Sequence, residues 1–257
     1  MSSSSSLTVA LALWLAWTLA TWLLEGLPRT LLRPEATGWR LAYAVIANLG
    51  VGLVVAALVA RRLVRRRELA AGDAGFGGVI RAALATIVGF GGGAALYKAQ
   101  GAPVTDAIVL VNVFAQVLTV SAAEIVVCWS VAGAATAAAL RGRGAIVSRL
   151  AGALVASALF GVHHVAHSPP FDTARMIALL TAVGLVTSVV FFGSRDVLGT
   201  IAFHNWLGTF GVTSALVEEG RIAEYARPNV GVVVTAVVTI ALVLAVYRAV
   251  RQPSPSR

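Results

Sequence analysis

Three ionisable side chains of this sequence lie within or at the end of strongly apolar stretches. Glu124 falls near the middle of the apolar segment 107–139, and His204 lies inside another, 197–217, beside Asn205. His164 ends a third, 146–166. An ionisable group placed in such a segment costs at least ~2.5 kcal/mol on membrane-insertion scales, so each is a candidate functional residue.

A carboxylate and two imidazoles on separate segments suit two kinds of chemistry. One is hydrolysis by a water activated by the carboxylate or by a metal; the metal would be zinc, held by Glu124, His164 and His204. His204 and Asn205 can also donate hydrogen bonds to an oxyanion. The other is a proton relay in a transporter. The structural alternative for Glu124 is a protonated carboxyl that bonds a neighbouring helix.

The stretch 159-LFGVHHVAHSPP-170 holds three of the four histidines. On a helix His163 and His164 point about 100° apart, so at most one faces a given site. No Glu follows the first His as in the HExxH zinc helix, and Ser-Pro-Pro breaks the helix directly afterwards. We take His164 as the site residue and expect His163 and His167 at the membrane surface.

The composition indicates that lipid is the main solvent. The chain is 58% hydrophobic and 12% charged, whereas a soluble domain carries about 25% charged residues. The formal net charge of +9 does not favour nucleic acid as a partner, because the arginines form short clusters between apolar runs, which is the membrane pattern.

Counting stretches of about 20 apolar residues gives eight candidate spans. They cover residues 7–25, 41–60, 78–97, 107–139, 146–166, 174–193, 197–217 and 229–250. With eight spans the arginine-rich segments 61–75, 141–149 and 247–257 all fall on one side, and the nearly neutral loops fall on the other. Basic loops belong in the cytoplasm, so we expect a multi-pass plasma-membrane protein with both termini cytoplasmic.

The expected fold is an all-α polytopic membrane bundle in three parts. Residues 1–104 would form three N-terminal spans, 105–217 a catalytic core of four spans, and 218–257 a last helix with a disordered basic tail. The stretch 89-GFGGG-93 predicts a helix-packing seam. In straight helices His164 would lie near the non-cytoplasmic end of its span and His204 nearer the cytoplasmic end, so their meeting would need a tilted or irregular helix.

The residues also resemble the CPBP family of intramembrane proteases, which includes the CAAX prenyl proteases and bacteriocin-processing proteins. That family carries Glu-Glu-x-x-x-Arg, then Phe-x-x-x-His, then His-x-x-x-Asn on successive core helices. Here 160-FGVHH-164 matches the second motif in full and selects His164. His204 follows at the distance expected for the third, with Gly208 in place of the family's Asn. Of the first motif, only Glu124 is present, and the Arg position falls on Cys128 or Trp129.

The resemblance implies an intramembrane endopeptidase that acts on a peptide or protein substrate, with membrane-anchored chains among the candidates. Glu124 would be the base, His164 its partner, and His204 with Asn205 the oxyanion side. Because the second Glu and the Arg are missing, an inactive relative that acts as a membrane scaffold or immunity protein is the alternative. A proton-coupled transporter ranks last, because no paired broken helices mark a substrate site.

Overall fold

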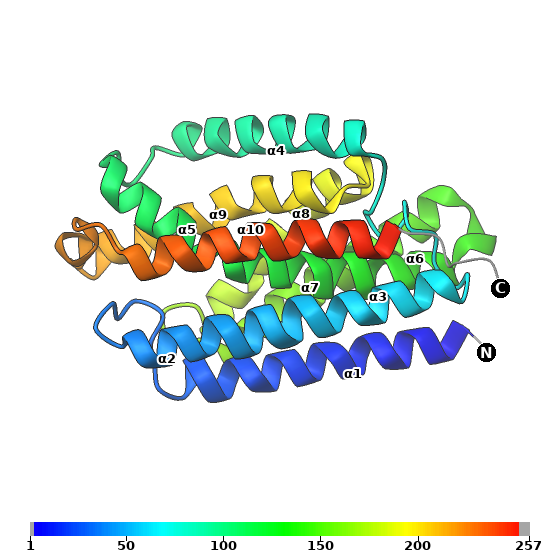
Figure 1. Cartoon of the computed structure of the whole chain (residues 1–257), viewed down its shortest axis with the longest axis horizontal. Helices are drawn as coiled ribbons and strands as arrows, with labels where there is room; N and C mark the ends of the chain where they lie inside the picture. Colours follow the sequence, from blue (N-terminus) through cyan, green and yellow to red (C-terminus); the bar gives the residue numbers. More distant parts are fainter. Residues whose placement is uncertain (1–2, 252–257) are drawn as a thin grey trace.

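The computed structural model describes residues 3–251, which form a bundle of long helices and contain no strand. Figure 1 shows the helices running side by side along one long axis. The elements are α1 (Ser3–Thr21), η1 (Trp22–Gly26), α2 (Thr37–Ala42), η2 (Tyr43–Val55), α3 (Ala56–Arg65), α4 (Val79–Ala99), α5 (Ala107–Glu124), η3 (Ile125–Gly133), α6 (Ala134–Ala139), η4 (Arg141–Arg143), α7 (Ala145–His163), η5 (His164–Ala166), α8 (Ala174–Ser194), α9 (Val197–Glu218), η6 (Ile222–Tyr225) and α10 (Val230–Arg251).

The all-α membrane fold is confirmed. Seven of the described helical segments are long and apolar enough to cross a bilayer, among them the continuous segments Thr37–Arg65 and Ala107–Ala139. The remaining expected span, 197–217, corresponds to α9, which is a helix of 22 residues but does not belong to this set. It carries His204, Asn205 and three buried threonines toward its neighbours, and these polar groups lower its hydropathy while the bundle keeps them from lipid.

The two ends of the bundle differ in charge. The first helix begins and the last helix ends at the same end (Figure 1). That end, which we call the basic end, also receives the α3–α4, α6–α7 and α8–α9 connections, with the clusters Arg61–Arg67, Arg141–Arg143 and Arg195. The opposite, neutral end receives residues 27–36, 100–106, 164–173 and 219–229, where acids and bases are mixed.

Side-chain caps begin three of the helices around the site, among them α5 with Glu124 and α9 with His204. Asp106 accepts the backbone N–H groups of Ile108 and Val109 at the start of α5. Thr173 accepts from Met176 at the start of α8, and Asp196 accepts from Gly199 at the start of α9. Each cap satisfies donors that the first helical turn leaves unpaired, so the caps fix where these three helices begin.

The predicted glycine seam of 89-GFGGG-93 is confirmed as the contact between α4 and α9. A Cβ added at Gly89 would lie 2.1 Å from the backbone oxygen of Gly199, and one added at Gly93 would lie 2.7 Å from the Trp206 ring. The backbones therefore touch where small residues permit it. This contact matters for the site because α9 carries His204.

A long π-helical stretch directly follows Glu124. The segment η3 continues α5 without a break, and all its residues are buried, in the core around Trp129. π-helical turns are rare and are found mostly at functional sites. Here the widened helix separates the part of the segment that carries Glu124 from α6.

Candidate active site around Glu124

The three sequence-predicted residues Glu124, His164 and His204 come together. Nε2 of His204 lies 3.1 Å from Oε2 of Glu124, and Nε2 of His164 lies 3.8 Å from Oε1 of the same carboxylate. All three side chains are buried. The structure therefore places one carboxylate between two imidazoles inside the bundle.

The expected difference in depth between the two histidines does not occur, because the helices are staggered. Ser130 donates to the Ala74 carbonyl at 2.6 Å, and the next carbonyl, Gly75, accepts from Val197 N–H at 2.9 Å. Ser130 and the start of α9 therefore lie at one level. Glu124 precedes Ser130 by six residues and His204 follows Val197 by seven, so both lie roughly one to two helical turns nearer the neutral end than this level.

Hydrogen bonds on the far side of each ring fix its orientation. Nδ1 of His164 lies 2.9 Å from the Phe160 carbonyl, and because a carbonyl only accepts, this nitrogen carries a hydrogen. The Thr187 hydroxyl donates to the Val183 carbonyl and lies 2.8 Å from Nδ1 of His204, so it accepts from this ring. Both Nε2 atoms are thereby turned toward Glu124.

These partners determine what each nitrogen can do. With its hydrogen on Nδ1, neutral His164 presents the lone pair of Nε2 toward the carboxylate and is a proton acceptor. His204 and Glu124 share one hydrogen between Nε2 and Oε2, as an imidazolium–carboxylate pair or as a neutral pair. The site therefore combines a proton acceptor and a proton donor within a few ångströms.

Aromatic rings hold the two imidazoles from one side. The Phe160 ring contacts His164 and His204 edge-on, with centroids 4.8 and 5.0 Å away. Trp129 packs on Phe160 at 5.3 Å, and its indole donates to Ser188 at 2.8 Å. Trp129 and Cys128, the two alternative positions for the single Arg of the resembled family's first motif, are thus part of the buried core.

A cavity of about 540 Å³ reaches these residues. Glu124, His164 and His204 lie on its wall together with many apolar side chains. These apolar residues are Leu31, Val117, Val120, Phe160, Phe171, Met176, Leu179, Leu180, Val183, Leu207, Phe210, Val212 and Ala215. A few polar groups converging in a mostly apolar cavity are typical of a ligand site.

The expectation that His163 and His167 lie at the membrane surface is wrong. Their side chains are 0% and 5% exposed. The Trp17 ring stacks on His163 with centroids 3.6 Å apart, and Tyr43 contacts His167 edge-on at 6.0 Å. Helices α1 and η2 cover the end of α7, a packing that the local sequence pattern does not contain.

A second buried acid, Glu25, lies beside this histidine cluster. Its carboxylate accepts the Ser168 N–H at 3.0 Å, the Ser168 hydroxyl and the Leu31 N–H at 3.1 Å. Nδ1 of His167 lies 3.1 Å from Oε2 of Glu25. Glu25 thereby joins the end of the first helix to the turn that carries His164.

The two acid–histidine pairs adjoin each other through stacked rings. The imidazoles of His164 and His167 lie with centroids 4.9 Å apart and planes 27° apart. Nε2 of His163, Nε2 of His167 and the Tyr43 hydroxyl are buried without a hydrogen-bond partner. Buried polar groups in proteins normally have hydrogen-bond partners. These three atoms therefore leave hydrogen-bonding capacity free next to the Glu124 site.

Asn205 is not brought to the carboxylate. Its amide nitrogen donates to the Phe114 carbonyl of α5 at 3.0 Å, so it ties α9 to α5. Position 208, where the resembled family has Asn, has no room for one: a Cβ on Gly208 would lie 2.6 Å from Cγ1 of Val117. The structure therefore does not bring Asn205 into the predicted oxyanion role beside His204.

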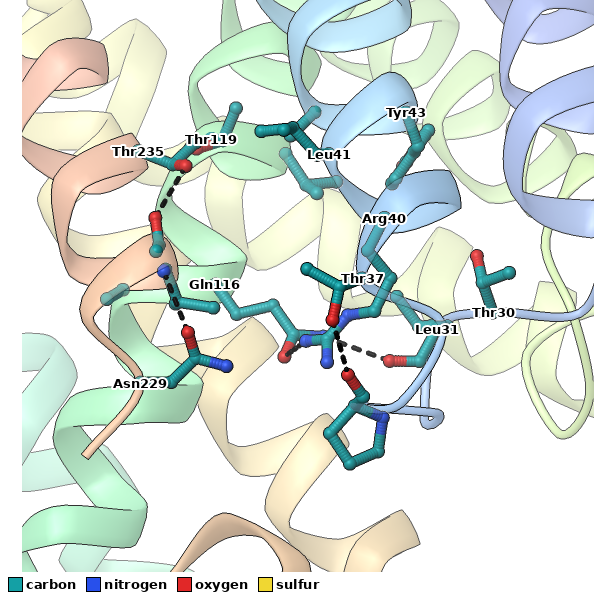
Figure 2. Close-up of a pocket in the computed structure, with 16 residues that line it drawn as sticks. Thr30, Leu31, Thr37, Arg40, Leu41, Tyr43, Gln116, Thr119, Asn229 and Thr235 are labelled. Atoms are coloured by element: carbon teal, nitrogen blue, oxygen red, sulfur yellow. Dashed lines mark hydrogen bonds between the residues drawn. The ribbon is translucent and has the colours of Figure 1, made fainter. Parts of the chain in front are cut away.

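A smaller cavity of about 130 Å³ lies beside the first, between α2, α5 and α10. Gln116 separates the two, because it lines both and its amide donates to the Leu31 carbonyl at 3.0 Å (Figure 2). Arg40 bonds the same Gln116 side chain. No acid or histidine lines this smaller cavity, whereas Glu124, His164 and His204 line the larger one.

The three residues do not fit a metal ion in this arrangement. Within residues 3–251 no group of three or more His, Cys, Asp and Glu side chains is placed so that it could hold one. The close contact between His204 and Glu124 also occupies two atoms that zinc would need as ligands.

Compared with protein-family models, with curated proteins and with solved structures, the chain has no match. The function is therefore argued from the geometry of the site.

Proposed function

We propose that this chain is an intramembrane endopeptidase in which Glu124 and His164 activate a water molecule. The observation that carries the proposal is the placement of one buried carboxylate between two inward-facing imidazoles on the wall of a large apolar cavity. The resemblance of 160-FGVHH-164 and His204 to the CPBP motifs supports the same chemistry. The chain would lie in the plasma membrane with both termini cytoplasmic.

In the proposed reaction, a water beside Oε1 of Glu124 and Nε2 of His164 loses a proton to one of these acceptors as it attacks the peptide carbonyl. The hydrogen shared by His204 and Glu124 is available to the carbonyl oxygen as negative charge develops on it. Collapse of the tetrahedral intermediate breaks the C–N bond, and the proton taken from water passes to the leaving amine.

The environment of the site favours this chemistry over a purely structural carboxyl. A protonated Glu that served packing alone would need one hydrogen-bond partner, whereas Glu124 faces two imidazoles oriented by Phe160 and Thr187. The apolar cavity wall would seat an extended peptide segment and keep bulk water away, which strengthens electrostatic interactions at the reacting bond.

The inactive-scaffold alternative is favoured by one observation. The first-motif Arg position is occupied by core residues, and Gly208 is closed against Val117. A scaffold would keep its partner and its phenotype when Glu124 becomes Gln, whereas a protease would lose both cleavage and any phenotype that depends on it.

The test is a comparison of peptide termini in membranes of cells that carry the wild-type chain, Glu124→Gln or Glu219→Gln. The last variant is the matched control, because Glu219 is an exposed acid outside the cavity. We expect a set of termini that is present with wild type and Glu219→Gln and absent with Glu124→Gln. A chelator added to the purified, active protein would test zinc directly.

Termini that persist in both the Glu124→Gln and the His164→Ala cells would contradict the proposed mechanism. Fluorescence-detected size exclusion on each variant separates loss of chemistry from loss of folding, because a misfolded variant would not give the wild-type elution profile.

A further inference from the structure

We infer that the catalytic cavity opens at the non-cytoplasmic face, so that the substrates are membrane-anchored or exported polypeptides cleaved at the outer side of the bilayer. This inference rests on the proposed function and adds the substrate class to it. Two independent observations carry it: where the cavity lies along the bundle, and how charge is distributed between the two ends.

The cavity occupies only the half of the bundle that faces the neutral end. Its wall comes from the first half of α8, represented by Met176 and Val183, and from α9 between His204 and Glu218. No residue of the connections 66–78, 140–144 or 195–196 lines it. The cavity thus begins at the level of Glu124 and His204 and runs away from the basic end.

The far limit of the cavity lies at the surface of the neutral end. Gln100, which follows α4, and Glu218, the last residue of α9, line it, and both side chains are exposed. Pro170 and Phe171 from the α7–α8 connection complete the same rim. The mouth is therefore formed by the connections that lie opposite the arginine clusters.

Charge orients the bundle in the membrane. The connections at the basic end carry Arg61, Arg62, Arg65, Arg66, Arg67, Arg141, Arg143 and Arg195. Short loops rich in Arg and Lys stay in the cytoplasm. The neutral end, and with it the cavity mouth, is then outside the cytoplasm.

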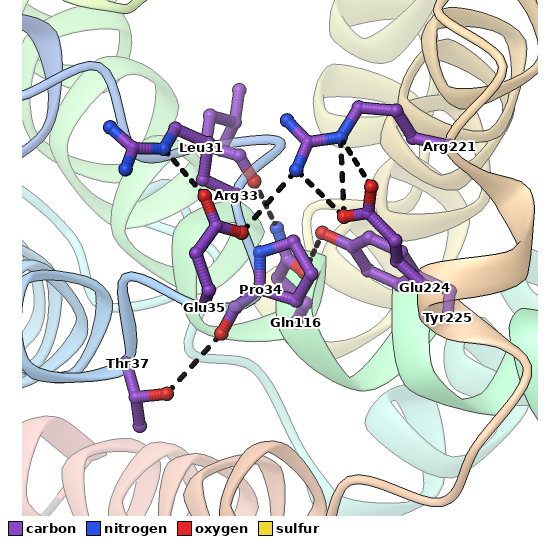
Figure 3. Close-up of polar contacts among 9 residues, drawn as sticks. All are labelled: Leu31, Arg33, Pro34, Glu35, Thr37, Gln116, Arg221, Glu224 and Tyr225. Carbon is purple, nitrogen blue, oxygen red and sulfur yellow. Dashed lines mark hydrogen bonds and ion pairs between the residues drawn. The ribbon is translucent and has the colours of Figure 1, made fainter.

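Ion pairs tie together the connections beside the mouth. Glu35 lies 2.7 Å from Arg33 and 3.3 Å from Arg221, and Arg221 lies 2.6 Å from Glu224 (Figure 3). The hydrogen bond from Arg33 holds the pKa of the Glu35 carboxyl below its usual value. Acids and bases are nearly balanced in these connections, whereas at the basic end the arginines outnumber the acids and Asp73 pairs with Arg141 and Arg195. The neutral end therefore carries no cytoplasmic signal.

The lipid-facing helix α8 determines which polypeptides can enter. Leu179 lines the cavity and is 55% exposed. The neighbouring wall residues are apolar, while the rim carries Gln100 and Glu218. An apolar segment anchored in the outer leaflet matches this wall, with its polar flank at the rim. A prenylated chain end at the cytoplasmic surface would face the packed half of the bundle.

The test uses single cysteines and a membrane-impermeant thiol reagent, a sulfonated methanethiosulfonate, on intact cells. The reporters are Gln100→Cys at the mouth, Ser214→Cys on the cavity wall and Gly142→Cys in the basic end, where added atoms meet nothing within 4 Å. The wild-type chain is the blank, because its one cysteine, Cys128, is buried.

We expect Gln100→Cys and Ser214→Cys to react in intact cells and Gly142→Cys to react only after permeabilisation. The reverse pattern would overturn the inference, and so would a Ser214→Cys that stays unreactive after permeabilisation. Labelling needs no hydrolysis, so an outward mouth on a protein that cleaves nothing would refute the proposed function alone. Conversely, cleavage sites confined to cytoplasmic segments would refute the sidedness while leaving the peptidase standing.

Discussion

Glu124 and His204 are 80 residues apart in the chain, yet the carboxylate Oε2 and the imidazole Nε2 lie 3.1 Å from each other. Each comes from a helix whose start is fixed by an Asp cap, Asp106 for α5 and Asp196 for α9. The contact therefore depends on how the two helices are placed along each other. It is the relationship from which the chemistry of the site follows.

The orientation of His204 should depend on Thr187. Replacing Thr187 with Val removes the acceptor of the Nδ1 hydrogen and leaves that buried donor unpaired. We expect cleavage of an identified substrate to fall about 10–100-fold, the range seen when the partner of a metal-bound imidazole is removed, with the fall in kcat rather than KM. Thr187→Ser keeps the acceptor and should restore the rate; an inactive Ser variant would argue against an orienting role.

The close glycine contact between α4 and α9 should contribute to the stability of the bundle. Gly89→Ala places a methyl group 2.1 Å from the Gly199 oxygen. We expect this overpacking to lower the free energy of unfolding by about 1–3 kcal/mol. Thermal unfolding in detergent measures it. The matched control is Gly91→Ala on the same helix, where an added Cβ meets nothing within 4 Å; this variant should be neutral or slightly stabilised. Equal effects at both positions would contradict a backbone contact.

Glu25 should hold the turn that carries His164. In Glu25→Gln one carboxylate oxygen becomes an NH₂ group, which cannot accept from Ser168 or Leu31. We expect about 1–3 kcal/mol of destabilisation from the donor left unpaired, together with faster proteolysis within residues 27–36. Glu35→Gln, an exposed acid in the same connection, should change stability by less than about 0.5 kcal/mol. An unchanged Glu25→Gln protein would show that the carboxylate is dispensable.

Introducing at position 208 the Asn of the resembled family should destabilise this chain. Gly208→Asn would press on Val117, because even a Cβ there lies 2.6 Å from its methyl group. We expect about 1–3 kcal/mol of destabilisation, relieved when Val117 is also changed to Ala. Thermal unfolding of the single and double variants tests this expectation. A stable single variant with raised activity would contradict it and would mean that α5 and α9 move apart and that the Asn completes the site.

The membrane class and most of the spans could be predicted from composition, because membrane-spanning segments are recognised by their length and apolar residues. Glu124, His164 and His204 could be singled out because ionisable groups are costly in such segments. Their meeting could not be predicted. It depends on the hydrogen bonds of Ala74 and Gly75 to Ser130 and Val197, which set the stagger of the helices.

Glu25 gave no signal in the sequence because its partners are distant. It is the last residue of the expected span 7–25, where an acid resembles an ordinary loop residue, and Ser168 lies 143 residues further on. His163 and His167 were misassigned for the same reason. A histidine-rich helix end resembles an interfacial one until Trp17 and Tyr43, from elsewhere in the chain, are seen to cover it.

The confinement of the cavity to one half of the bundle has an electrical consequence. Beyond Glu124 the other half is filled by Trp129, Val126 and Phe191, side chains with at most 1% exposure. Water drawn in from the mouth therefore stops at the carboxylate and finds no continuous path to the opposite face. A protein of this kind can supply water to a peptide bond in the middle of the bilayer and still leave the membrane insulating. A high abundance of the protein should therefore not dissipate the ion gradients of the cell that makes it.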